Sequence, residues 1–401
     1  MFNSLKFKVI LFGFIFTFFS SFGQSYFLGL FNSSIREALS ITHGQFGSIF
    51  ASATLCSSLL LIWVGKKIDD VNIFKFAFFV TILLSFACFF FSKVSSVLLL
   101  FIGIFLMRFS GQGMMSHTAS TTISRYFTRT RGRALSISWF GLSSAEFIMP
   151  VLMVYLLTII NWQNLWIIFS ITVLIILPIA SFLLIKNLNL DSREANDENK
   201  KEVEIKQWKR REVIKDYRFY IISSNMLAMP WIFTGFAVFQ SFVQTSKGWG
   251  PYVIAQSFMS YSIFSVLTLF LSGFLIDKYT SRKLLIYMNI PLLLSVIVLF
   301  FFDTPATAFV FLGLVGISNG FANILGSSTW AELYGVKYLG SIKALTTALM
   351  VFATAFGTAL FGYLIDTGFT VGDIAVVSGT YIFISLILLF FVRKKLNPVI
   401  I

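Results

Sequence analysis

The sequence predicts an all-α membrane protein whose twelve transmembrane helices form two pseudo-symmetric six-helix bundles. Hydrophobic residues make up 57% of the 401 residues, whereas charged residues make up only 12%. The apolar residues form runs of about 20 without strand-like alternation, which is the length that spans a bilayer as a helix. A helix is favoured because its backbone polar groups are hydrogen-bonded internally, as the hydrocarbon core requires.

The apolar runs come in two groups of six. In chain order, the predicted spans are Val9–Leu30, Phe46–Val64, Ile73–Phe91, Val97–Thr118, Ala134–Ile159, Leu165–Ile185, Tyr220–Val243, Tyr252–Ile276, Leu284–Phe302, Ala308–Thr329, Ile342–Ile365 and Ile374–Val392. The hydrophilic segment Lys186–Arg218 separates the sixth run from the seventh. We therefore predict an N-terminal bundle at residues 1–185, a cytoplasmic linker formed by this segment, and a C-terminal bundle at residues 219–401. Within the linker, a surface helix around Val203–Val213 is expected to place Trp208 among the lipid headgroups.

The basic residues of the loops predict the orientation of the chain. Clusters of Lys and Arg occur in every second loop and at both termini, whereas the other loops carry only Arg36, Lys93 and Lys247. Cytoplasmic loops are enriched in Lys and Arg, so both termini are expected to be cytoplasmic. The same rule explains the net charge of +14, and no nucleic-acid partner is predicted. The Phe-, Ile- and Lys-rich composition is typical of a cell inner (plasma) membrane protein of bacteria.

Two ionisable residues lie deep inside predicted spans. Arg108 precedes Arg125 by 17 residues and Glu146 follows Arg133 by 13, which places them roughly 26 Å and 20 Å from the cytoplasmic edge. A charge near mid-bilayer costs several kcal/mol unless it is paired or faces a watered cavity. We expect Arg108 to anchor an anion or tune an acid, and Glu146 to be a protonatable coupling group. The alternative is a static ion pair that holds the two helices together.

His117 is the third ionisable candidate within a span. It lies about 12 Å from the cytoplasmic edge of the fourth span, at a rise of ~1.5 Å per residue. An imidazole there can relay protons near neutral pH. A hydrogen bond from this ring to a neighbouring helix is the alternative interpretation.

A short pattern recurs in the two halves of the chain. Gly65 stands four residues before Asp69 after the second span, and Gly273 stands four residues before Asp277 after the eighth. The two copies are 208 residues apart, about the period expected for two six-helix halves and a linker. Internal repeats of this kind are typical of secondary transporters, with the substrate site near the bilayer midplane.

This pattern resembles the loop signature of the major facilitator superfamily, in which Gly-x-x-x-Asp is followed by basic residues. The second copy matches at Gly273, Asp277, Lys278, Arg282 and Lys283, whereas the first has Asp70 where a basic residue is usual. The resemblance implies alternating access in a monomer. It also implies a gating role for these loops, in which their carboxylates contact helix ends and arginines. The glycines would allow close helix approach, and loop solvation is the alternative.

A second, shorter resemblance points to the monocarboxylate-porter branch of that superfamily. The matching positions of its fifth-span motif are Tyr126, Phe127, Arg129, Arg131, Ala134 and Gly141. The first-span motif of the branch is absent, and SSFGQSYF stands in its place. The branch resemblance therefore covers about twenty residues.

In the superfamily, spans one, four, seven and ten line the central cavity, which implies a set of substrate-binding residues here. The polar or aromatic residues within these spans are Arg108, Gln24, Tyr26, Gln112, Asn225, Trp231, Gln240 and Asn319. Each could instead join neighbouring helices by hydrogen bonds. Because Trp231 follows Pro230, the seventh span is predicted to break there.

The predicted function is secondary active transport of a small organic anion, such as a monocarboxylate, together with protons. No P-loop, His/Cys ligand cluster or hydrolase motif is visible, so no enzyme activity, cofactor, metal site or catalytic residue is predicted. The expected partners are a small-molecule substrate, protons and the lipid bilayer. One alternative is proton-driven efflux of amphipathic compounds, for which Phe and Met would supply an adaptable surface. Another, of a different class, is a non-transporting receptor that signals through the linker.

Overall fold

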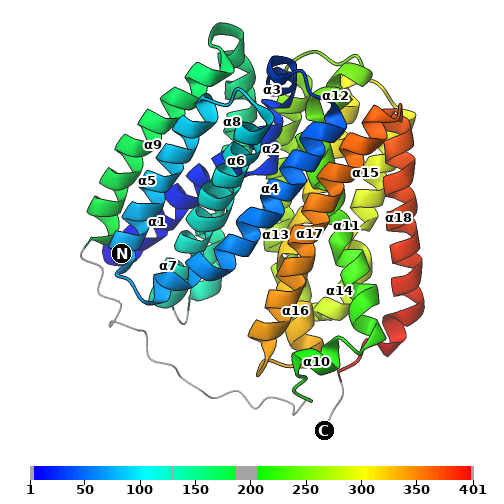
Figure 1. Cartoon of the computed structure of the whole chain (residues 1–401). Helices are drawn as coiled ribbons and strands as arrows, with labels where there is room; N and C mark the ends of the chain where they lie inside the picture. Colours follow the sequence, from blue (N-terminus) through cyan, green and yellow to red (C-terminus); the bar gives the residue numbers. More distant parts are fainter. Residues whose placement is uncertain (1–3, 128–129, 187–205, 399–401) are drawn as a thin grey trace. The chain divides into compact units, whose positions relative to one another are not determined.

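The computed structural model describes residues 4–127, 130–186 and 206–398, and these ranges contain helices and loops without a strand. Twelve of the helical stretches are long and apolar enough to cross a membrane, as the sequence predicts. The chain divides into two compact units, Met1–Asn199 and Lys200–Ile401. Figure 1 shows the helices of both units in sequence colours.

Unit 1 contains six spans, two of which are interrupted. Its elements are α1 (Ser4–Ser20), η1 (Ser21–Gly23), α2 (Ser25–Gly29), α3 (Asn32–Leu39), α4 (His43–Val64), η2 (Gly65–Asp69), α5 (Ile73–Ser92), α6 (Val97–Met107), η3 (Arg108–Met115), α7 (Ser116–Tyr126), α8 (Arg131–Ile159) and α9 (Trp162–Ile185). The first span consists of α1, η1 and α2, and the fourth consists of α6, the π-helical segment η3, and α7. Within the unit, α5 packs against α9, α1 against α8, and α4 against α6.

The packing of α1 against α8 explains the small residues at the start of the fifth span. A Cβ on Gly141 would lie 2.1 Å from the Phe14 carbonyl oxygen, and one on Gly13 would lie 2.4 Å from Ser138 Oγ. Thr17 Oγ1 donates to the Ser138 carbonyl oxygen at 2.5 Å. Small residues allow two membrane helices to approach closely, so these positions join α1 to α8.

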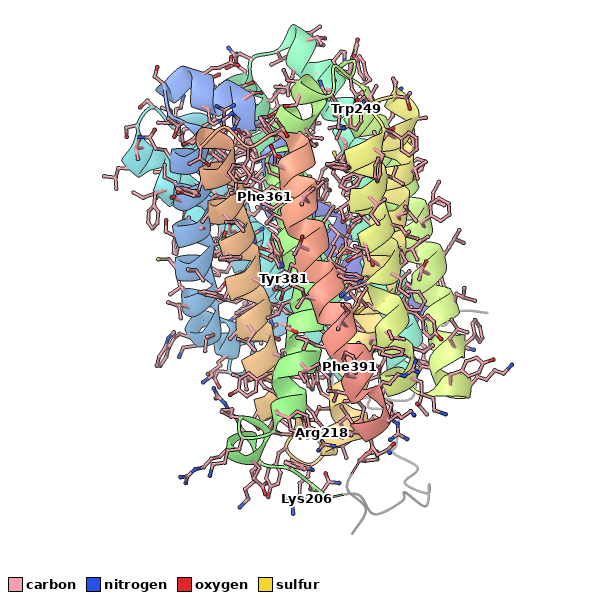
Figure 2. All side chains as sticks on the ribbon, turned by 90° about the vertical axis from the view of Figure 1, so that its right-hand side faces the viewer. Lys206, Arg218, Trp249, Phe361, Tyr381 and Phe391 are labelled. Carbon is pink, nitrogen blue, oxygen red and sulfur yellow. The ribbon has the colours of Figure 1, made fainter. Side chains whose placement is uncertain are left out.

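Unit 2 contains the other six spans. Its elements are α10 (Arg210–Val213), α11 (Tyr217–Val238), α12 (Gln240–Ser246), α13 (Val253–Tyr279), α14 (Ser281–Met288), α15 (Ile290–Phe301), α16 (Pro305–Tyr334), α17 (Leu339–Asp366), α18 (Val371–Val392) and η4 (Arg393–Lys395). Here α13 packs against α16, α11 against α17, and α15 against α18. The outer faces carry exposed apolar side chains such as Phe391, which is 74% exposed on α18 (Figure 2). Such side chains suit contact with lipid tails.

The sequence predicts a break of the seventh span at Pro230, and this prediction is wrong. Helix α11 continues through this residue, and the interruption comes at Phe239, before α12. A proline removes one helical hydrogen bond, and membrane helices tolerate this loss when neighbouring helices enclose them. Most of α11 is buried.

The prediction of a surface helix around Val203–Val213 is also wrong for the residues of this segment that the structure describes. Only Arg210–Val213 are helical, residues 206–209 are extended or irregular, and residues 203–205 lie outside the described ranges. Trp208 packs on the bundle, with its ring centroid 5.4 Å from that of Tyr334. The Trp208 backbone N–H donates to the Tyr334 carbonyl oxygen at 3.0 Å. The segment therefore forms part of the surface of unit 2.

Candidate functional site

The interruptions of the first and fourth spans meet in unit 1 at two glycines. A Cβ on Gly23 would lie 2.3 Å from the Gln112 backbone nitrogen and 2.4 Å from the Met107 carbonyl oxygen. A Cβ on Gly111 would lie 2.7 Å from the Gly23 nitrogen. The two backbones are therefore in direct contact, which only glycine permits at this distance. Half-buried Gln24 and Gln112 lie at this crossing, which is formed by η1 and η3.

Arg108 is the first residue of the π-helical segment and lies beside the same crossing. Its side chain is buried, and Nη1 donates to the Gly23 carbonyl oxygen at 3.0 Å and to Ser25 Oγ at 3.1 Å. The Phe50 ring of α4 lies 5.4 Å from the guanidinium carbon. The break in the first span leaves its carbonyl groups without helical donors, so it supplies acceptors for a guanidinium. π-helical segments are frequent at functional sites.

Most of the hydrogen-bonding capacity of Arg108 is unused. A guanidinium has five N–H donors, and only the two on Nη1 have partners among the described residues. The Nε atom is enclosed without a partner. A buried cation with free donors can bind an anion through charge-assisted hydrogen bonds.

Glu146 is buried on α8. Pro150 lies four residues further along the same helix and has no N–H, so the Glu146 carbonyl lacks its helical donor. Glu146 is therefore a buried acid at a point where the helical hydrogen bonding of α8 is interrupted.

The structure does not show the ion pair between Arg108 and Glu146 that the sequence offered as an alternative. No carboxylate lies within ion-pair distance of Arg108 among the described residues, and its hydrogen-bond partners are Gly23 and Ser25. The guanidinium is directed to the backbone acceptors of the broken first span. In this conformation the two deep charges are therefore separate groups.

His117 contacts the loop at the end of the second span. Its Nε2 atom lies 3.0 Å from the Gly65 carbonyl oxygen, and Arg125 Nη1 donates to the Ile68 carbonyl oxygen at 3.1 Å. The first contact corresponds to the helix-joining interpretation of His117. The loop carbonyls after α4 are thus held by two side chains of α7, at some distance along the fourth span from Arg108.

The candidates on α11 form contacts with other helices of unit 2. Asn225 is fully buried, its Nδ2 atom lies 3.4 Å from Ser385 Oγ, and its carbonyl oxygen accepts from Asn289 Nδ2 at 2.5 Å. Asn289 stands between α14 and α15, where the ninth span is interrupted. Trp231 packs edge-on against Tyr381 of α18, with ring centroids 5.2 Å apart. These side chains join helices in this conformation.

The remaining two candidates of unit 2 also lie apart from one another. Asn319 Nδ2 donates to Ser265 Oγ at 2.9 Å, which joins α16 to α13. Gln240 Nε2 donates to the Ala237 carbonyl oxygen at 2.9 Å, within one turn of the chain. The predicted cavity residues therefore converge in unit 1 but not within unit 2.

The gating candidate Arg282 forms a network at one end of unit 2. Its Nε atom lies 2.9 Å from Glu332 Oε1, and its Nη1 donates to the Leu396 carbonyl oxygen at 3.2 Å and to Asn397 Oδ1 at 2.9 Å. Glu332 also accepts from the Ser281 backbone N–H at 2.9 Å. The start of α14, the end of α16 and the C-terminal segment are thus joined through one arginine.

The argument from close helix approach does not hold at the second loop glycine. A Cβ on Gly273 would meet only Ile324 Cδ1 at 4.0 Å, and one on Gly65 would lie in ordinary contact with His117 at 3.4 Å. The neighbouring helices therefore leave room for a side chain at both positions. The side chains of Asp69 and Asp277 lie outside the described part of the structure.

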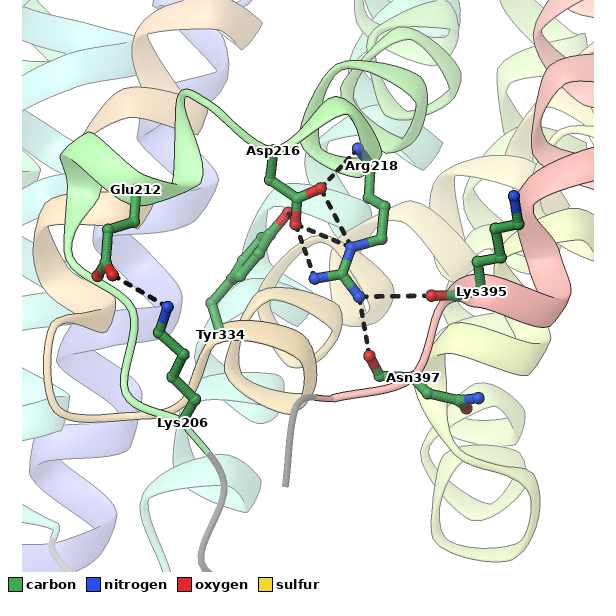
Figure 3. Close-up of polar contacts among 7 residues, drawn as sticks. All are labelled: Lys206, Glu212, Asp216, Arg218, Tyr334, Lys395 and Asn397. Carbon is green, nitrogen blue, oxygen red and sulfur yellow. Dashed lines mark hydrogen bonds and ion pairs between the residues drawn. The ribbon is translucent and has the colours of Figure 1, made fainter. Parts of the chain in front are cut away.

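A second arginine holds the same C-terminal segment, as Figure 3 shows. Arg218 Nε donates to Asp216 Oδ2 at 2.8 Å, and Tyr334 OH donates to the same oxygen at 3.2 Å. Arg218 Nη1 donates to the carbonyl oxygens of Asn397 at 2.8 Å and Lys395 at 3.4 Å. Sequence reasoning missed this network because its acid and base lie at the edge of the predicted linker, where charges are usually solvated.

Comparisons with known proteins agree with this architecture. A family model described as Major Facilitator Superfamily matches residues 13–259. The structure of a bacterial homolog of the human lysosomal transporter Spinster, inward-facing and unoccupied, has a TM-score of 0.76 at 13% identity and covers 99% of this chain and 98% of that chain. The nucleoside transporter NupG has a TM-score of 0.70 at 15% identity, with 98% of each chain covered. No curated protein matches the sequence.

Twelve apolar helices and the match to the family model define the class as a multi-pass membrane transporter rather than an enzyme. The family match spans more than half of the chain. The protein belongs to the Major Facilitator Superfamily, and the prediction of its family and fold class is confirmed.

Proposed function

We propose that this transporter moves a small monocarboxylate-like organic anion together with protons across a cell inner membrane by alternating access. Residues 1–185 and 219–401 would form the two moving bundles of a monomer, with Lys186–Arg218 as a cytoplasmic linker and both termini cytoplasmic. The single observation that supports an anionic substrate is that Arg108 is a buried cation whose Nε has no partner. Arg108 is therefore assigned as the anion anchor.

Glu146 is proposed as the proton carrier. Its carboxyl group is buried and has no ion pair or hydrogen bond with a described residue. A carboxylate at this depth costs several kcal/mol, whereas a neutral acid avoids that cost. Proton uptake at Glu146 and anion binding at Arg108 would each neutralise one buried charge. Asp69, Asp277 and Arg282 are proposed to act in the switch between conformations, and His117 is proposed to act in proton coupling.

The experiment is proton movement in proteoliposomes that contain a pH-sensitive dye. Small carboxylates and then lipophilic cations are added to wild type, Arg108→Gln, Glu146→Gln and the control Lys93→Gln, which removes an exposed cation outside the site. We expect carboxylates to drive proton entry in wild type and in the control. Loss of hydrogen bonds to a charged group, at about 1.5–3 kcal/mol each, should weaken the apparent affinity of Arg108→Gln about 10- to 100-fold.

The two site variants should fail in different ways. Glu146→Gln should lose proton entry but retain exchange of labelled carboxylate across the bilayer, because the anion anchor is intact. Proton release driven by lipophilic cations would support efflux instead. Unchanged affinity in correctly folded Arg108→Gln would refute the anion anchor.

A further inference from the structure

A concentrated group of basic residues lies just before the seventh span. Residues 206–215 contain five basic residues and one acidic residue, a formal net charge of +4. The acidic residue, Glu212, pairs with Lys206 at 3.0 Å (Figure 3). The other four bases have no ion pair among the described residues, and they are exposed: Lys209, Arg210, Arg211 and Lys215. We call these four residues the α10 cationic patch.

The chain that carries the patch is fixed to unit 2 rather than free in solution. Gln207 Oε1 accepts from the Lys337 backbone N–H at 2.9 Å, and Trp208 packs on Tyr334. Between Arg211 and Lys215 of the patch, Val213 is fully buried in the core of the unit. Anchored cations lose less conformational freedom on binding than those of a flexible linker, so the patch is preorganised for a ligand.

Exposed apolar and aromatic side chains lie next to the patch. Ile214 is 41% exposed, Tyr217 is 52% exposed and Tyr220 is 55% exposed. The Tyr220 hydroxyl donates to the Ile214 carbonyl oxygen at 2.8 Å, which places this tyrosine against the end of α10. Tyr217 is the first residue of the seventh span. Tyrosines are enriched where a membrane helix enters the headgroup region.

From this combination we propose that the α10 cationic patch and its adjoining tyrosines bind the headgroups of acidic phospholipids. The cations would bind the lipid phosphates, and Ile214 with the tyrosines would contact the glycerol and the first part of the acyl chains. A membrane source is favoured over a soluble anion because the patch runs directly into the membrane-spanning part of α11. The inference rests on the proposed function in one respect: the proposed cytoplasmic position of the linker decides which leaflet supplies the lipids.

The test compares lipid binding by the full-length protein and two matched triple variants. Apparent dissociation constants for phosphatidylglycerol and phosphatidylcholine are measured by native mass spectrometry of the purified protein in detergent. The patch variant is Lys209→Gln/Arg210→Gln/Arg211→Gln. The control variant is Lys66→Gln/Lys67→Gln/Lys75→Gln, which removes three exposed bases next to the second and third spans. A double variant, Arg210→Gln/Arg211→Gln, serves if the triple variant is unstable.

Each basic residue of the α10 cationic patch that contacts the phosphate of the bound lipid should strengthen binding by about fivefold. Loss of three should therefore weaken phosphatidylglycerol binding by as much as about 100-fold, and loss of two by as much as about 25-fold. The control should weaken it by less than about threefold, and phosphatidylcholine binding should not change in any variant. An equal loss in patch and control variants would overturn the proposal, since binding would then follow total charge.

Two further readings separate the lipid from other ligands and from the transport proposal. Millimolar inorganic phosphate that displaces phosphatidylglycerol completely would show an ordinary phosphate site and would overturn the lipid assignment. Transport of carboxylates is measured on the patch variants, and wild-type anion affinity is expected because the patch is distant from Arg108 in the sequence and in another unit. The results for lipid binding and for the anion anchor at Arg108 are therefore independent of one another.

Discussion

Replacement of Gly23 by alanine should disrupt the crossing between the first and fourth spans. The added Cβ would lie 2.3 Å from the Gln112 nitrogen and 2.4 Å from the Met107 carbonyl oxygen, whereas heavy atoms of carbon normally sit about 3.5–4.0 Å apart. Both contacts are with backbone, so the two segments must separate by about 1 Å. The bond from Arg108 to the Gly23 carbonyl, now 3.0 Å, would lengthen to about 4 Å and be lost.

The expected cost follows from these two effects. Overpacking costs about 1–3 kcal/mol, and loss of one hydrogen bond to a charged group costs about 1.5–3 kcal/mol. Because the backbone relaxes in part, we expect a total of about 2–5 kcal/mol. For a unit of this size, at about 2–4 °C per kcal/mol, the thermal midpoint should fall by about 4–20 °C.

The assay is thermal unfolding of the purified protein in detergent, followed by size-exclusion of the heated sample. Gly326→Ala is the matched control, since this glycine also lies within a span and a Cβ there meets nothing within 4 Å. The control should unfold within about 2 °C of wild type or slightly higher, because alanine favours helix. A midpoint of Gly23→Ala equal to that of the control would refute the tight crossing and the role of the Gly23 carbonyl.

Two further predictions concern the polar network of unit 2. Arg282→Gln and Glu332→Gln should each lower the thermal midpoint. A double-mutant cycle should give a coupling free energy of about 0.5–1 kcal/mol, which is small because the ion pair is partly exposed. A coupling of zero would show that the ion pair does not contribute to stability. The N–H of Lys209, followed by the contact with Lys206, holds the pKa of Glu212 below its ordinary value of 4.5. Because the pKa of Glu212 is depressed in the folded state, its carboxylate stabilises the fold above pH 4.5, and this stabilisation is lost as the pH falls through the folded pKa. Hydrogen exchange of residues 206–213, corrected for intrinsic rates, should therefore rise below the folded pKa. Glu212→Gln should abolish this pH dependence, and a wild-type pH profile in this variant would exclude Glu212 as its cause.

The number of spans could be predicted from the sequence because it follows from the length and polarity of apolar runs. Hydropathy averages over a span, however, so it does not reveal where a helix breaks. The π-helical segment at Arg108 and the extended residue Gln24 both lie within apolar runs. Pro230 was the residue expected to interrupt a helix, yet α11 continues through it because neighbouring helices enclose the position. Tertiary packing decides the breaks.

The charged residues of the site could be predicted from the sequence, but the residues that they contact could not. A buried charge is visible in a sequence because it interrupts an apolar run, and Arg108 and Glu146 were identified in this way. The partners of Arg108 are the backbone carbonyl of Gly23 and the hydroxyl of Ser25, and Glu146 is buried without an ion pair or hydrogen bond to a described residue. Backbone acceptors carry no residue-type signal, so attraction between opposite charges suggested the wrong partner for Arg108.

The separation of the two deep charges has a consequence for the proposed mechanism. If Arg108 were paired with Glu146, an incoming anion would compete with that carboxylate, and proton and anion would act on one contact. With the guanidinium directed to the broken first span, the anion neutralises Arg108 while the proton neutralises Glu146. Each buried charge costs several kcal/mol when it is alone, so the bundle that holds both ligands carries the least uncompensated charge. The proposed symport of one proton with one monocarboxylate therefore moves no net charge, and its rate in proteoliposomes should not depend on membrane potential; a rate that follows an imposed potassium diffusion potential would require a different stoichiometry.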